Sequence, residues 1–187
     1  MVSQIKVNEI IKQSGSSITI GESGDTIDLS NPSSVTLNST MKNTPSFAAV
    51  NNATQTFSMD SWTKANIQNE VYDTNDAFSD SRFTVPSGEA GKYLITIQAA
   101  LQSSAAYREA RMGVYKNGAI VESLEFRLRL TDQYFNAGSS QRLNSSGVLD
   151  LAVGDYIELY GLMSGGSGTP QFNTPTVAMT ATKIIGA

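Results

Sequence analysis

The segment that most restricts the fold of this chain is 145–161, with the sequence SSGVLDLAVGDYIELYG. Hydrophobic residues precede its turn, and the residues after it alternate, so that Ile157 and Leu159 point to one side. Such alternation indicates a strand with one buried face, and Gly154-Asp155 supplies the positive φ or side-chain hydrogen bond that a tight turn requires. The segment predicts an antiparallel hairpin whose residues Ile157 and Leu159 lie in the core or in a subunit interface.

Composition limits both the size of the protein and its chemistry. The chain has 187 residues, of which 40% are hydrophobic, so it can form one substantial core and an appendage. Its 13 basic and 17 acidic residues give a net charge of -4, which does not favour binding to a phosphate backbone. The sequence contains no Cys and no His, and it therefore lacks the commonest general base and the usual zinc ligands. We expect a non-enzymatic protein with no cofactor and no nucleic-acid partner.

The start of the chain shows no secretory signal, and no hydrophobic run approaches the roughly 20 residues that span a bilayer. We expect a soluble product that is not inserted in a membrane.

Residues 1–43 differ from the rest because they contain no aromatic residue. Short hydrophobic pairs recur among turn-forming residues, at Ile18/Ile20, Ile27/Leu29 and Val35/Leu37. Each pair is too small to form a core, so the segment requires stacking or copies of itself to become ordered. It is either a short β-rich stem, in which three chains bury these residues around one axis, or a disordered Ser/Thr-rich tail.

Residues 44–187, here called the head, carry aromatic residues in short alternating segments. Lys116-Asn117-Gly118 separates two of these segments, and Asn-Gly is the strongest short signal for a hairpin turn. About ten strands without a helical period predict an all-β, antiparallel jelly-roll sandwich. The segments 69–81 and 165–170 are expected to be loops, and Trp62 is expected in the core. The expected strands are 45–50, 55–57, 62–67, 82–86, 92–99, 111–115, 119–123, 124–130, 148–151, 156–160 and 176–185.

The order and spacing of several motifs resemble the globular head of complement component 1q and its relatives of the tumour necrosis factor type. The resemblance runs from about Ser46 to the C-terminus, and the Gly-Val-Leu strand followed by Gly154-Asp155 is its most specific part. It implies a ten-stranded jelly roll that assembles as a tight homotrimer and binds ligands through loops or grooves without catalysis. The motifs are FTVP at 83–86, GKYLI at 91–95, VYKNG at 114–118, SGVLDL at 146–151, GDYIEL at 154–159 and NEVYD at 69–73.

A second resemblance concerns the N-terminus. IKVNEI at 5–10, followed by a Gly/Ser-rich Ile-Thr-Ile segment, is similar to the starts of tail-fibre and other virion structural proteins of marine bacteriophages. It implies a virion protein that accumulates in the host cytoplasm, needs no signal peptide, and contacts neighbouring virion proteins through 1–43.

Strand 124–130 carries the first group of candidate site residues. Arg127 and Arg129 share one face of it, where they either pair with an acid such as Glu109 or bind an anionic ligand. Phe126 and Leu128 are expected in the core or in the trimer interface.

The loop after this strand carries the second group. Tyr134 and Phe135 form either a platform for a sugar ring or protein epitope, or a cluster at the trimer axis.

The third candidate is a metal loop. Asp73, Asp76 and Asp80 cluster oxygen ligands as a calcium loop does, but the spacing is not that of an EF-hand, and a solvated loop is the simpler interpretation.

Three functions of different kinds are consistent with these features. The first is an adhesin, a homotrimeric phage fibre or spike whose head binds a host-surface glycan or protein. The second is a capsid-decoration or tail-collar trimer that binds no receptor. The third, a secreted signalling ligand of the tumour necrosis factor type, is disfavoured because no signal or membrane anchor is visible.

Overall fold

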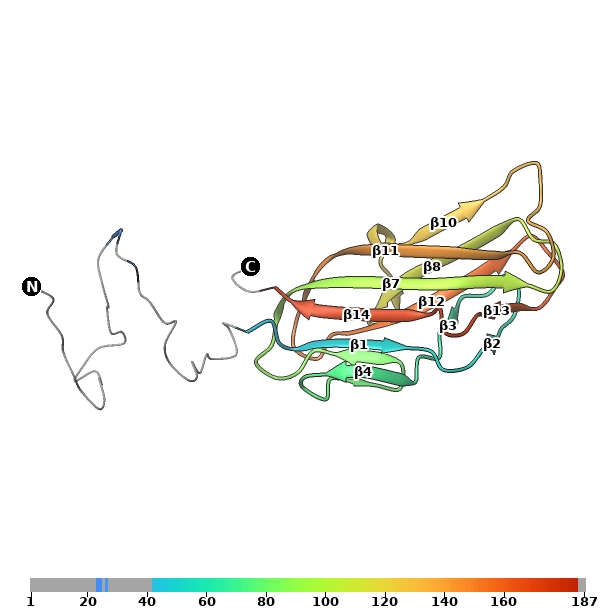
Figure 1. Ribbon diagram of the computed structural model, residues 1–187. Helices are drawn as coiled ribbons and strands as arrows, with labels where there is room; N and C mark the ends of the chain where they lie inside the picture. The colour runs from blue at the N-terminus through green and yellow to red at the C-terminus, as the bar shows by residue number, and fades with distance from the viewer. Residues whose placement is uncertain (1–22, 25, 27–41, 185–187) are drawn as a thin grey trace, which may run out of the picture. The chain divides into compact units, whose positions relative to one another are not determined.

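The computed structural model describes residues 23, 24, 26 and 42–184 (Figure 1). The predicted stem and the hydrophobic pairs at 18–37 lie outside the described residues, so the stem and its boundary at residue 43 stay predictions. Within 42–184 the chain forms strands and one 3-10 helix, η2 (Glu122–Leu124), and this part contains no α-helix.

Two antiparallel sheets face each other in the head. In the first sheet the longest strand, β7, pairs with β11 along one edge and with β14 and β13 along the other, and β1 lies between β14 and β4. Its strands are β1 (Ser46–Val50), β2 (Gln55–Thr56), β4 (Asn69–Asp73), β7 (Gly91–Ser103), β11 (Ser140–Leu151), β13 (Pro170–Phe172) and β14 (Ala178–Lys183).

The second sheet has the order β10-β8-β12-β6-β5, with β9 beside β8 and β3 beside β12. Ten of the fourteen strands of the described chain have three residues or more. The predicted all-β antiparallel jelly roll is therefore confirmed. The strands of the second sheet are β3 (Thr63–Lys64), β5 (Phe78–Ser79), β6 (Arg82–Thr84), β8 (Glu109–Lys116), β9 (Ala119–Ile120), β10 (Phe126–Arg129) and β12 (Tyr156–Ser164).

The turn after Leu151 connects the two sheets and does not close a hairpin. β11 pairs with β7 along its whole length, whereas β12 pairs with β8, β6 and β3. The predicted hairpin is therefore wrong, although its turn chemistry is correct: Gly154 has φ +82°, and Asp155 accepts a hydrogen bond from the Ala152 N–H at 2.9 Å. Alternation shows that a strand has one buried face, but it does not show which strand lies beside it.

The predicted Asn-Gly turn does close a hairpin. Asn117 and Gly118 both have positive φ, 52° and 82°, as a type I′ turn requires, and Tyr115 pairs with Ile120 across it. The second strand, β9, is shorter than predicted because η2 follows at once.

The core lies between the sheets and contains the alternate residues of β7. Tyr93, Ile95 and Ile97 of this strand are fully buried. Phe47 of the first sheet stacks on Phe78 and Phe83 of the second, with ring centroids 4.7 and 5.0 Å away. These aromatic contacts hold the two sheets together at this end.

Three strands were not expected from the sequence. β4 and β5 lie within 69–81, which was predicted to be a loop, and β13 begins at Pro170, the last residue of the second predicted loop. The exposed pattern of β4 explains the first error, since all five of its residues are exposed or half-buried and no alternation marks it as a strand.

Candidate functional site

The middle of the solvent-facing side of the first sheet is covered by small, uncharged residues, and the exposed charged residues Lys92, Asp150 and Arg142 lie on the same side towards its ends. Leu94 of β7 lies opposite Val148 of β11 and Thr182 of β14, and Thr96 lies opposite Ser146 and Thr180. Fully buried cores of protein interfaces are depleted in charge, so a surface of this composition is suited to association. We call this surface the uncharged face, and its residues are Ala48, Val50, Leu94, Thr96, Gln98, Asn144, Ser146, Val148, Ala178, Thr180 and Thr182.

The solvent-facing side of the second sheet has the opposite character, because charged and aromatic side chains alternate across it. The Tyr115 and Tyr160 rings stack with centroids 4.0 Å apart, and Trp62 meets Tyr115 edge-on at 5.7 Å. The Arg111 guanidinium lies 5.0 Å from the Trp62 ring centroid. Trp62 is half-buried on this surface, so its predicted place in the core is wrong.

Glu158 is the centre of the charges on this side. Its side chain is only 3% exposed, and its Oε1 accepts hydrogen bonds from Lys64 Nζ at 2.7 Å and from Arg82 Nε at 2.9 Å. Burial alone would raise the pKa of Glu158, but the bonds from Lys64 and Arg82 outweigh it and hold this pKa below its ordinary value. The Arg82 guanidinium also lies 3.9 Å from the Tyr156 ring centroid. The Glu158 carboxylate is thus ionised and is bound by the side chains of Lys64 and Arg82.

Arg127 and Arg129 do share one face of β10, on the solvent side of the second sheet. Arg127 forms an ion pair with the buried Glu109, the structural alternative considered from the sequence, and Ser164 Oγ donates to the same carboxylate at 3.0 Å. Arg129 is exposed and forms no ion pair with a described residue. Of these two predicted ligand-binding residues, only Arg129 has a guanidinium without a carboxylate partner in the described chain.

The four predicted core or interface residues separate into two pairs. Ile157 and Leu159 of β12 are fully buried in the core. Phe126 and Leu128 lie on the inner side of the edge strand β10, where Phe126 remains 39% exposed and Leu128 packs partly against the core.

The two aromatic rings of the 131–139 loop, Tyr134 and Phe135, have different environments. Phe135 packs against the buried Tyr107, with ring centroids 5.1 Å apart, and the two backbones exchange a pair of hydrogen bonds. Tyr134 is 50% exposed and lies under the Arg108 guanidinium, 4.4 Å from its ring centroid. Tyr134 therefore presents a rigid aromatic surface, supported by an arginine that the sequence analysis did not identify.

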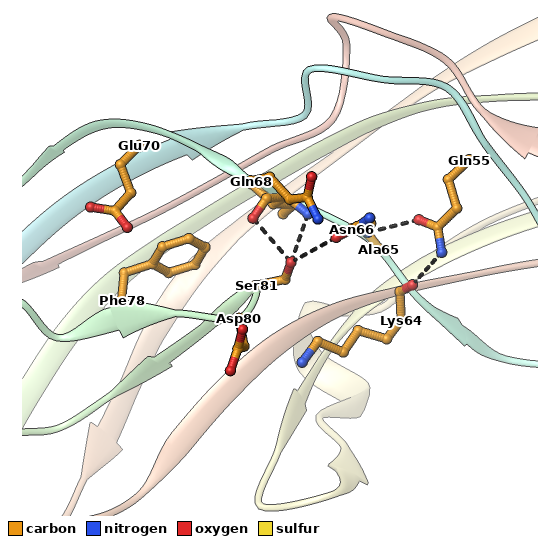
Figure 2. A pocket seen from close by; sticks show the side chains of 10 residues that line it. Gln55, Lys64, Ala65, Asn66, Gln68, Glu70, Phe78, Asp80 and Ser81 are labelled. Atoms are coloured by element: carbon orange, nitrogen blue, oxygen red, sulfur yellow. Dashed lines mark hydrogen bonds between the residues drawn. The ribbon is translucent and has the colours of Figure 1, made fainter.

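A polar pocket of about 450 Å³ lies between the β3–β4 connection and the β5–β6 hairpin (Figure 2). This volume is within the range of about 300–1,000 Å³ that is typical of small-molecule sites. Sequence analysis missed it because most of its residues lie in the 65–68 connection and the 80–81 turn, and the others lie in short or unpredicted strands. The lining residues are Gln55, Lys64, Ala65, Asn66, Ile67, Gln68, Glu70, Phe78, Asp80 and Ser81.

Two side chains hold the wall of this pocket in place, as Figure 2 shows. Gln55 Nε2 donates to the Lys64 carbonyl at 2.9 Å, and its Oε1 accepts from the Asn66 N–H at 2.7 Å. Ser81 Oγ accepts from the Ile67 N–H at 2.8 Å and donates to the Ile67 carbonyl at 3.0 Å. The connection thereby keeps its backbone polar groups satisfied without strand pairing.

The aspartates considered as calcium ligands lie in or beside turns of the backbone. Asp73 accepts hydrogen bonds from the backbone N–H groups of Asn75 and Phe78, at 3.2 and 2.7 Å. Asp80 lies in the β5–β6 turn and lines the pocket. Among the described residues, no group of three or more acidic side chains is placed to hold a metal ion.

Comparisons with known proteins bear on the fold. No protein-family model matches the sequence, and no curated protein matches it significantly. Among solved structures, Eiger TNF from S. frugiperda is similar over 76% of this chain and 93% of its own, with 13% identity and a TM-score of 0.55. Murine APRIL is similar over 74% and 98%, with 15% identity and a TM-score of 0.50.

The head has a tumour-necrosis-factor-like jelly-roll fold. The globular domain of zebrafish complement 1qA protein is also similar, over 75% of this chain and 97% of its own, with 18% identity and a TM-score of 0.49. In the described part of the chain, no helix has the length and hydrophobicity needed to cross a membrane.

Proposed function

We propose that the head is a non-enzymatic binding module that associates as a homotrimer through its uncharged face. The observation that carries this proposal is the difference between the two solvent-facing sides. The uncharged face exposes Leu94 and Val148, and the charged residues of the same side, Lys92, Asp150 and Arg142, lie towards its ends, whereas the opposite side is occupied by ion pairs and aromatic rings. Association through the first side leaves the second side, the polar pocket and Tyr134 open to a ligand.

The number of three subunits and the absence of catalysis follow from the resemblance to the complement component 1q and tumour necrosis factor type of head. The ion pairs of this chain support the absence of catalysis. The buried carboxylates Glu158 and Glu109 are neutralised by Lys64, Arg82 and Arg127, so neither has the unpaired, perturbed character of a catalytic acid or base.

The proposed biological setting is a bacteriophage virion, in which the head ends a tail fibre or spike and binds a host-surface ligand. The support is the sequence of residues 5–10, which is similar to the starts of marine phage virion proteins. In this setting 1–43 attaches the trimer to neighbouring virion proteins, and the protein is made in the host cytoplasm.

Adsorption to cells tests this function. Fluorescently labelled full-length protein is mixed with cells of a panel of marine bacteria, and the bound fraction is measured after washing. Saturable binding to particular strains supports the adhesin. Intact trimers that bind no strain contradict it and favour the capsid-decoration or tail-collar role.

A further inference from the structure

We infer that the polar pocket of Figure 2 binds a neutral sugar unit, such as a terminal hexose of a surface glycan. This inference rests on the proposed function, because it names the ligand class of the same binding head. Seven of the ten lining residues have polar side chains, whereas most small-molecule pockets are lined mainly by hydrophobic ones. A pocket with this lining suits a ligand that presents polar groups as well as hydrophobic surface.

The hydrogen-bonding groups that remain free in the pocket match hydroxyl groups. Gln68, Glu70 and Asp80 are exposed, and none of their side chains makes a hydrogen bond or ion pair with another described residue. Carboxylates accept hydrogen bonds and amides both donate and accept, so these three can bind several hydroxyl groups that are each donor and acceptor. Figure 2 shows them around the same hollow as the Phe78 ring.

Phe78 supplies the hydrophobic part that a sugar ring requires. It lines the pocket, and it is held by stacking on Phe47, with the rings inclined by 16°. Only 4% of its surface is exposed, so it offers a small, fixed hydrophobic contact to the C–H groups of a sugar without losing side-chain freedom on binding.

The charges select a neutral ligand over an anionic one. Lys64 is the only cationic lining residue, and its ammonium is already bound to the buried Glu158. Glu70 and Asp80 have no cationic partner in the described chain, so the pocket repels carboxylates, sulfates and phosphates.

The geometry of the pocket is fixed before a ligand arrives. Asp80 and Ser81 have φ of 50° and 59°, a left-handed conformation that non-glycine residues adopt infrequently. The two hydrogen bonds between Ser81 and Ile67, one donated by each residue, hold this turn against the 65–68 connection. A preformed pocket loses less entropy on binding than a flexible one.

Saturation-transfer NMR and isothermal titration calorimetry with the full chain test this inference. The probes are the methyl glycosides of glucose, galactose and mannose and free N-acetylglucosamine, compared with glucuronic acid as the anionic counterpart. We expect one or more neutral sugars to bind. Glu70→Gln and Asp80→Asn each remove a charged acceptor and should weaken that sugar about tenfold. Glu122→Gln, an exposed control on η2, should leave the affinity unchanged.

Three results overturn the inference: no neutral sugar binds, binding is insensitive to Glu70→Gln and Asp80→Asn, or the anionic sugar binds better than its neutral counterpart. Its failure is distinguishable from failure of the proposed function. If the wild type adsorbs to cells and the two pocket variants adsorb equally well, only the pocket assignment is wrong. If the wild type adsorbs to no cells, the adhesin itself is wrong, whatever the sugar titrations show.

Discussion

Leu94 of β7 and Val148 of β11 are directly paired on the solvent side of the first sheet, and 46% and 51% of their surfaces are exposed. Cross-strand neighbours of this kind contact each other, and here both are hydrophobic, next to the charged residues Lys92 and Asp150 on the same side. Association of copies would bury the pair, which makes it the place where the proposed trimer is most sensitive to mutation.

Leu94→Asp and Val148→Asp should each dissociate the oligomer while the head stays folded. An aspartate in the uncharged face would lose much of its hydration on association, at a cost of several kcal/mol. Size-exclusion chromatography with light scattering gives the mass, and far-UV circular dichroism reports the fold. Val153→Asp is the matched control, because Val153 is equally exposed but lies in the turn after β11. If the mass is unchanged in both variants, this face does not form the interface.

Glu158→Gln should destabilise the head by about 2 kcal/mol, measured by urea unfolding. The variant removes the anion shared by Lys64 and Arg82, whose side chains are 32% and 42% exposed and can partly return to water. The loss should therefore be smaller than the 3–5 kcal/mol that is usual for a fully buried pair. Glu122→Gln on the exposed η2 should change the free energy of unfolding by less than about 0.5 kcal/mol. Equal stability of the two variants would show that the Glu158 cluster is energetically neutral.

Asp155→Asn should destabilise the protein at neutral pH but not in strong acid. Hydrogen bonds from Lys116, Asn117 and the Ala152 N–H lower the pKa of Asp155 from 3.8 to about 2. Because the pKa of the folded state is the lower one, the contribution is complete above about pH 4 and disappears as the pH falls through 2. Solvent around this turn limits it to about 1 kcal/mol.

Urea titrations of the wild type and of Asp155→Asn between pH 7 and pH 2.5 check this prediction. The difference in the free energy of unfolding should be constant down to about pH 4 and then shrink. A difference that persists unchanged at the lowest pH would mean that the carboxylate charge is not its source.

Gly161→Ala should destabilise the fold by about 1–3 kcal/mol, as overpacking does in other cores. A Cβ at Gly161 would lie 2.5 Å from the Phe172 ring, which is fully enclosed. Gly147→Ala is the comparison, since its Cβ would meet only the tip of the Leu124 side chain, at 2.7 Å, and that tip can rotate. The melting temperature of Gly161→Ala should be lower than that of Gly147→Ala. The reverse order would show that Leu124 adjusts to an added methyl group less readily than Phe172 does.

The strand content of the head could be predicted because most of its strands bury one face. β7, for example, alternates between buried and exposed residues from Lys92 to Ala99, and periodicity is the signal that sequence carries most clearly. Pairing could not be predicted in the same way. β11 and β12 follow each other through a tight turn but belong to different sheets, because contacts with β7 and β8, distant in sequence, decide their places.

The binding features were less accessible to sequence reasoning. Glu109 could be named as one possible partner of Arg127, but the sequence left an anionic ligand as the alternative, and only the structure shows the ion pair. Tyr134 and Phe135 are adjacent in sequence, but the backbone pairing of Phe135 with Tyr107 separates their environments. The polar pocket is formed by two-residue strands and turns, whose side-chain hydrogen bonds leave no periodic pattern.

The most direct test of the central claim is the native mass in solution by light scattering, for the full chain and for a chain that begins at Thr44. We predict three times the mass of one chain in both cases, which is 20.0 kDa per subunit for the full chain, because the uncharged face lies within the head. A monomer in both cases would contradict the trimer and the fibre, and would leave a single jelly-roll binding domain.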